Sequence, residues 1–120
     1  MNKAIGTKDV LKANKIVYHF AKNQKENPLP MTIGILYNFF TNILNYHYAK
    51  DKSKNNIASI LRISPFFVQE YQVAANNYSI KKAVKVIEYL RDYDLKSKGV
   101  NNTSATPGDL LKELVFKIIH

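Results

Sequence analysis

The sequence predicts an all-α protein that folds as a single bundle of five main helices and one short helix. Apolar residues recur at spacings of three and four along almost the whole chain, and no segment alternates with the period of two that is typical of a strand. Serine, threonine and proline stand where new apolar stripes begin, as is typical of helix N-termini. A length of 120 residues fits one domain. We expect a lead or linker over residues 1–6 and an all-α domain over residues 7–120.

The first predicted helix follows Thr7, its expected N-cap, and ends near Asn23. The next and most apolar helix covers residues 31 to about 50, with Pro30 in its first turn. This helix carries two apolar stripes. The main stripe consists of Ile33, Leu36, Phe40, Ile43, Leu44 and His47. The second contains Ile35, Phe39 and Tyr46 and is interrupted by Asn42.

A helix that is apolar on two sides is either central in a bundle or packed against another subunit. Both interpretations remain open for Ile35, Phe39 and Tyr46. We take these three residues as candidates for a protein interface, together with Phe66 at the start of a later helix.

A short helix over residues 57–61, a tight turn at Arg62 and a helix start at Ser64-Pro65 have the order of a helix-turn-helix. DNA binding through residues 56–76 is therefore the alternative function. The start of the second helix, however, offers the ring of Phe66 where a DNA-reading helix offers polar groups. An aromatic ring at this place is better suited to contact with protein.

Ser79 is the expected N-cap of a long helix that ends before Gly99, a residue typical of the position after a helix end. The predicted buried face of this helix is Ile80, Ala83, Val84, Ile87 and Leu90. Asp94 continues that face, and we expect it to form a half-buried ion pair with Lys98, four residues later. Residues 100–105 form a predicted loop, and Thr106 is the expected cap of the last helix.

No constellation of residues indicates catalysis, a cofactor or a metal ion. The chain has no cysteine, and its four glycines are too far apart in sequence to build a phosphate-binding loop. None of its three histidines has metal-ligand spacing. We expect His47 to be a packed histidine, and Glu88 and Asp92 to lie on a solvated helix face.

The formal net charge is +9, from 18 basic and nine acidic residues, which invites a nucleic-acid interpretation. The charge is spread along the chain and is almost entirely lysine, so it also fits solvated helix faces. No stretch of about 18 apolar residues could span a membrane, and the N-terminus has no apolar signal segment. We therefore expect a cytoplasmic protein.

The order of these features resembles one known family. A lysine- and alanine-rich first helix precedes Pro28-Leu29-Pro30 and the long apolar helix, and the run from Ile60 to Val68 follows. Asp94-Leu95 and Lys98-Gly99 then stand before a leucine-rich last helix. Over roughly residues 5–119, this order is similar to that of the C-terminal domain of the delta subunit of bacterial DNA polymerase III, a part of the clamp loader.

The resemblance implies an all-α domain that joins its counterparts in the other clamp-loader subunits to form a ring-shaped collar. It also implies that the chain is the last part of a longer protein, and that DNA is met indirectly, through the whole assembly. The family has no catalytic residues in this domain. The function expected from the resemblance is therefore non-catalytic oligomerisation in the assembly that loads the sliding clamp during DNA replication.

Overall fold

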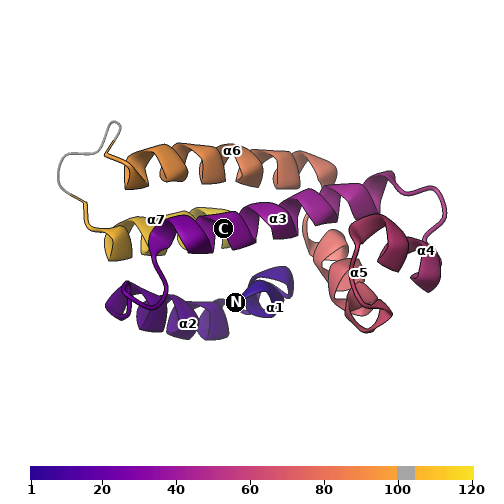
Figure 1. Cartoon of the computed structure of the whole chain (residues 1–120), viewed down its shortest axis with the longest axis horizontal. Helices are drawn as coiled ribbons and strands as arrows, with labels where there is room; N and C mark the ends of the chain where they lie inside the picture. Colours follow the sequence, from indigo (N-terminus) through magenta and orange to yellow (C-terminus); the bar gives the residue numbers. More distant parts are fainter. Residues whose placement is uncertain (100–104) are drawn as a thin grey trace.

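The computed structural model describes residues 1–99 and 105–120, and every regular element in these ranges is helical (Figure 1). The elements are α1 (Asn2–Gly6), α2 (Val10–Lys22), α3 (Leu29–Tyr48), α4 (Lys54–Leu61), the 3₁₀ turn η1 (Pro65–Phe67), α5 (Val68–Asn77), α6 (Ile80–Ser97) and α7 (Pro107–Ile119). The predicted all-α bundle is confirmed. Most of the predicted loop over residues 100–105 lies outside the described residues. None of the described helices combines the length and the hydropathy needed to cross a bilayer.

Helix α3 is the centre of the bundle. It runs along the long axis of a molecule that measures 46 × 25 × 24 Å, and it packs against α4, α5, α6 and α7 (Figure 1). Its buried residues come from both predicted stripes: Leu29, Thr32, Ile33, Leu36, Phe39, Phe40, Asn42, Ile43 and Tyr46. Because other helices cover α3 on more than one side, most of its second stripe belongs to the core of this chain.

Local capping explains where the later helices begin. The Ser79 hydroxyl accepts a hydrogen bond from the Lys82 N–H at 3.1 Å, and the Thr106 hydroxyl accepts one from the Asp109 N–H at the same distance. Each satisfies an N–H that has no partner within its helix. After α6 the backbone of Gly99 has a φ of +89°, which favours glycine. These predicted boundaries are confirmed.

Residues 1–6 differ from the expected lead segment, because Asn2–Gly6 form helix α1 and contact α5 and α2. Ala4 and Ile5 are buried. A helix of five residues is too short to show a periodic apolar stripe, and isolated helices of this length are unstable in water. Packing against α5 therefore stabilises a helix that the sequence pattern does not reveal.

Thr7 is not the N-cap of α2. It follows α1, and its hydroxyl donates a hydrogen bond to the Lys3 carbonyl at 2.9 Å. The cap of α2 is Asp9, whose carboxylate accepts the N–H of Lys12 at 3.1 Å. Thr7 and Asp9 are both good caps, and the presence of α1 decides between them.

The buried face of α6 is rotated from the predicted one. Ile80 and Val84 are about two-fifths exposed. The residues that face the core are Ala83, Val86, Leu90 and Tyr93. The large ring of Tyr93 is buried where α6 packs against α3 and α7, so the neighbouring position, Asp94, lies at the edge of that contact. The Asp94 carboxylate lies 3.0 Å from the Lys98 ammonium group.

Tyr78, between α5 and α6, links three parts of the fold. Its hydroxyl donates to the Ile5 carbonyl at 2.8 Å, and its own carbonyl lies 2.8 Å from Nε2 of His47, which acts as the donor. Its ring packs edge-on against Phe40, with centroids 5.0 Å apart. The residue has no exposed surface, and burial raises the pKa of its hydroxyl. One side chain thus joins α1 to α3 at the start of α6, and His47 is a packed histidine as predicted.

Replacing Tyr78 by phenylalanine should lower the free energy of unfolding by about 0.5–1.5 kcal/mol, because the Ile5 carbonyl would lose one of its two donors and keep the Lys8 N–H at 3.0 Å. Urea denaturation followed by circular dichroism measures this. The control is Tyr37→Phe, since Tyr37 lies on α3 with nearly half of its surface exposed. Equal stability of the Tyr78→Phe variant and the wild type would contradict the assigned role.

The stability of the wild type should fall as the pH rises above about 10, the ordinary pKa of tyrosine. Because the folded state holds the Tyr78 proton more tightly than the unfolded state, its stabilising effect is complete below that pH and declines above it. Thermal melts between pH 8 and 11 should show a smaller decline for Tyr78→Phe than for the wild type.

Candidate protein-interaction surface

Three adjoining shallow hollows lie on the surface formed by α1, η1, α5 and α3, with single residues of α2 and α4 at their edges. The middle hollow is lined by Lys3, Gly6, Thr7, Phe66, Gln69, Glu70 and Val73. The second is lined by Met1, Asn2, Lys3, Phe20, Thr32, Ile35 and Glu70. The third is lined by Tyr46, Lys52, Lys54, Pro65, Phe66, Val68, Gln69 and Gln72. The hollows share residues, and we call the continuous area that they form the Phe66 surface.

The four interface candidates all lie at this surface or directly behind it. Phe66 is 82% exposed and borders two of the hollows, and Ile35, which is 47% exposed, lines another. Tyr46 lines the third hollow with a side chain that is almost entirely buried. Phe39 is buried behind Gly6, where an added Cβ would lie 3.2 Å from Cζ of its ring. Of these four candidates, only Phe66 and Ile35 therefore offer a large apolar area to a partner.

The turn before α5 explains why Phe66 points outward. Helix α4 ends at Leu61, and the next residue, Arg62, has left-handed backbone angles (φ 56°, ψ 48°) that are uncommon for a residue other than glycine. The chain then reverses, and the Ser64 hydroxyl accepts the Phe66 N–H at 3.3 Å. No residue of η1 is buried. The rings of Phe66 and Phe67 pack edge-to-face, 5.4 Å apart, so each limits the motion of the other.

Comparison with models of known protein families shows which family the chain belongs to. A family model described as the C-terminal domain of the DNA polymerase III delta subunit matches residues 1–112. The chain belongs to this family. Comparisons with curated proteins and with solved structures found no match. The matched range contains the whole Phe66 surface, and the resemblance seen in the sequence is confirmed.

The delta-family domain presents apolar rings where a helix-turn-helix protein presents its base-reading groups. Pro65, Phe66 and Phe67 occupy the first turn after α4, and Phe67 is nearly half exposed. DNA-reading helices place polar side chains there to meet base edges. This element therefore has the helix-turn-helix order but not the surface chemistry of a DNA reader.

The charged side chains of the Phe66 surface are mainly basic. Lys3, Lys52 and Lys54 line its hollows, and Glu70 is the acidic residue among the lining side chains. Lys52 is held in place because its ammonium group donates to the Ala49 carbonyl at 2.6 Å. Exposed aromatic and aliphatic side chains accompanied by charged ones are typical of protein–protein interfaces.

The acidic side chains of α6 do not line the Phe66 surface. Among residues 1–99 and 105–120, no cluster of histidine, aspartate and glutamate side chains is arranged to hold a metal ion. Glu88 lies 3.5 Å from Lys85 in an exposed ion pair. Asp92 is also exposed. Asp94 and Lys98 form another ion pair near the C-terminal end of α6, and neither residue lines the Phe66 surface.

The sequence pattern did not single out the residues of α5 and α1 that line this surface. Gln69, Glu70 and Val73 follow Phe66 at helical spacing and form the side of α5 opposite its buried residues. That spacing could have revealed them. Lys3 and Gly6 could not be found in this way, because α1 places them beside α5 through tertiary packing.

The structure predicts opposite outcomes for two phenylalanine substitutions. Phe39→Ala should lower the free energy of unfolding by about 3–5 kcal/mol, since it leaves a cavity in the core. Phe66→Ala should change it by no more than about 0.5 kcal/mol, since the ring is exposed. Urea titrations of both variants give the two values. A large loss for Phe66→Ala would show that its ring is part of the core.

Proposed function

We propose that this chain is a non-catalytic oligomerisation domain of a DNA polymerase III delta subunit, and that it joins the other clamp-loader subunits in a collar. Its role would be to hold the assembly that loads the sliding clamp during DNA replication, a process of the cytoplasm. The observation that carries the proposal is an 82% exposed Phe66 between adjoining hollows, on a domain of the delta family.

Burial of Phe66 provides a driving force for association. Moving a phenylalanine side chain from water into an apolar contact stabilises a complex by about 1.5–3 kcal/mol. Aromatic anchors of this kind carry much of the binding energy of an interface, especially where neighbouring side chains exclude water around them. Here Pro65 and Val73 extend the apolar area, and the hollows on either side of Phe66 can receive side chains of a partner.

Ile35 places a second apolar contact at the other end of the surface. It lies on α3, while Phe66 lies on η1, and Lys3 and Glu70 line the hollow next to each of them. A partner that covers both residues would span more than one helix, as a broad subunit interface requires. Lys3 and Glu70 lie between the two apolar sites and can exchange ion pairs with groups of both charges.

Association with the other clamp-loader subunits tests the proposal. In size-exclusion chromatography with light scattering, the wild-type chain should elute in a complex with them at micromolar concentration. Phe66→Ala should weaken the complex by about 30-fold, as expected for an anchor worth about 2 kcal/mol. The matched control is Phe116→Ala, because Phe116 is also an exposed aromatic residue but lies on α7.

Two results would contradict the proposal. The first is no association of the wild type at micromolar concentration. The second is an equal effect of Phe66→Ala and Phe116→Ala, which would show that the Phe66 surface is not the contact.

A further inference from the structure

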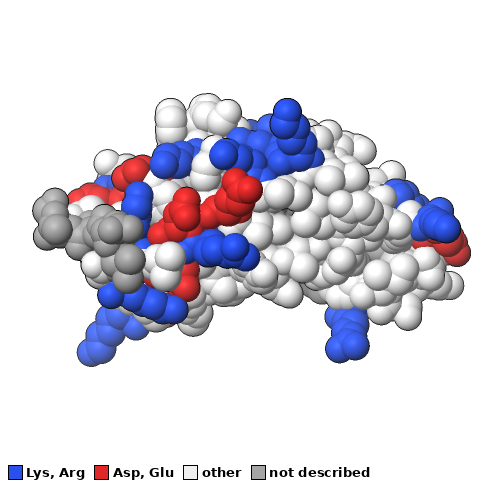
Figure 2. Space-filling model, turned by 90° about the horizontal axis from the view of Figure 1, so that it is seen from above, with Lys and Arg blue, Asp and Glu red and all other residues white. Residues whose placement is uncertain are grey.

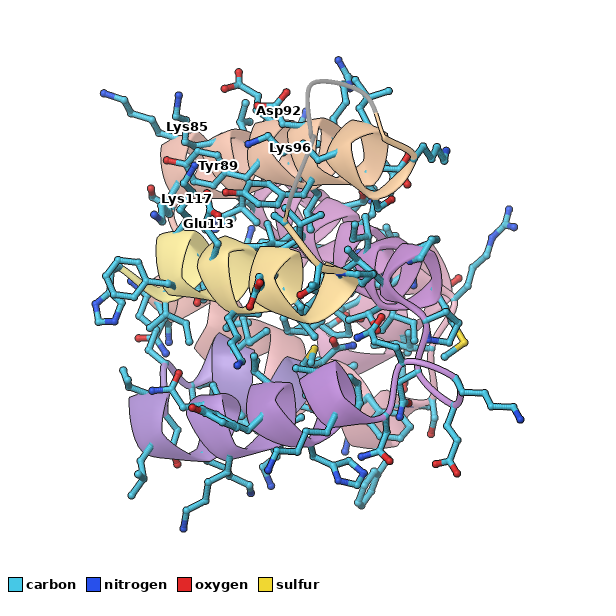
Figure 3. All side chains as sticks on the ribbon, turned by 90° about the vertical axis from the view of Figure 1, so that its left-hand side faces the viewer. Lys85, Tyr89, Asp92, Lys96, Glu113 and Lys117 are labelled. Atoms are coloured by element: carbon cyan, nitrogen blue, oxygen red, sulfur yellow. The ribbon has the colours of Figure 1, made fainter. Side chains whose placement is uncertain are left out.

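Five lysines gather where α6 begins and α7 ends, and we call this group the lysine patch: Lys8, Lys81, Lys82, Lys85 and Lys117. Figure 3 shows Lys85 on α6 and Lys117 on α7 directed toward Tyr89. The patch contains none of the residues that line the Phe66 surface.

Tyr89 brings three of the ammonium groups together. The Nζ atoms of Lys82, Lys85 and Lys117 lie 5.9, 5.6 and 5.7 Å from the centroid of its ring. Cation–π attraction holds each lysine near the ring. An ammonium group that rests on a ring keeps N–H donors for other partners, because the ring uses one side of it.

Lys8 and Lys82 bring further positive charge close together. The Lys82 ammonium donates to the Lys117 carbonyl at 3.3 Å, which ties α6 to α7. Burial and the positive charge of Lys8 lower the pKa of Lys82. The Lys8 ammonium itself rests 4.8 Å from the centroid of the Tyr78 ring. Mutual repulsion of these cations would be relieved by a bound anion.

Nearby carboxylates neutralise only part of the patch. Glu88 lies 3.5 Å from Lys85, and Glu113 lies 3.9 Å from Lys117. Both pairs are exposed, and exposed pairs contribute only about 0–1 kcal/mol, so an incoming anion can replace them. Within residues 1–99 and 105–120, no ion pair involves Lys8 or Lys82. Figure 2, which looks onto α6, shows a group of basic side chains toward the start of this helix, and basic and acidic side chains beside one another nearer its end.

We propose that the lysine patch binds the phosphodiester backbone of nucleic acid without reading its sequence. The charges come from α6, α7 and the segment between α1 and α2, so a polyanion that passes over all three can neutralise more of them than a single phosphate can. Lysine supplies point charges that suit phosphate oxygens, and it lacks the planar fork by which arginine reads guanine. Membership of a DNA polymerase III family favours nucleic acid over an acidic protein as the polyanion. The inference does not depend on the proposed oligomerisation.

Fluorescence anisotropy with labelled 30-nucleotide single-stranded and duplex DNA tests the inference on the 120-residue chain. The triple variant Lys82→Gln, Lys85→Gln, Lys117→Gln should bind at least about tenfold more weakly than the wild type at about 50 mM salt. The slope of log affinity against log salt should become shallower by about three, one for each phosphate contact removed.

Two further variants separate the patch from the overall charge and from the fold. Lys15→Gln, Lys25→Gln, Lys50→Gln removes the same charge from exposed lysines on other segments and should lower affinity by less than about threefold. Replacing Lys82, Lys85 and Lys117 by arginine keeps the charge and should preserve binding. Thermal melts check that all variants fold.

Several results would overturn the inference. No binding of the wild type at low salt would do so, as would equal losses in the two glutamine triples. An arginine triple that binds as weakly as the first glutamine triple would show that the effect is structural and not electrostatic. Displacement of the DNA by polyglutamate as effectively as by unlabelled DNA would assign the patch to an acidic protein.

Discussion

Tyr78 is fully buried, and the arrangement of this domain depends on the contacts of its side chain and its backbone carbonyl. Its hydroxyl holds the Ile5 carbonyl of α1, its carbonyl accepts from His47 of α3, and its ring packs on Phe40. A polar group without exposed surface is stabilising only if its hydrogen bonds are made. Tyr78 makes them with two elements that are distant in sequence, so it fixes where α5 ends and α6 begins relative to both.

The Phe66 surface depends on this arrangement. The Asn77 amide, next to Tyr78, donates to the Gly6 carbonyl at 2.9 Å, so two adjacent residues anchor the end of α1. Gly6 can then approach Ala74 and Phe39 closely because it has no Cβ. Helix α1 therefore covers Phe39 on one side, and its residue Gly6 lines the hollow beside Phe66. The same short helix, α1, therefore contributes residues both to the core and to the candidate interface.

The Phe66 surface and the lysine patch lie on different helices and offer different kinds of side chain. The Phe66 surface uses η1, α5, α1 and α3, and its centre is aromatic. The lysine patch uses α6, α7 and Lys8, and tyrosine rings hold its cations. Since they share no residue, a protein partner and a polyanion could be bound at once. Such a division would suit a domain that keeps an assembly together close to DNA.

Local sequence determined the helical class, the caps at Ser79 and Thr106, the end of α6 at Gly99 and the exposed turn at Phe66, because each follows from residues within one helical turn of each other. Tertiary structure alone decided that Phe39 is core while Ile35 is surface, since both continue the same apolar stripe and only the positions of the neighbouring helices tell them apart. It also decided the rotation of α6 toward Tyr93 and the existence of α1. These depend on contacts between residues far apart in the chain, whose packing energy exceeds any local preference.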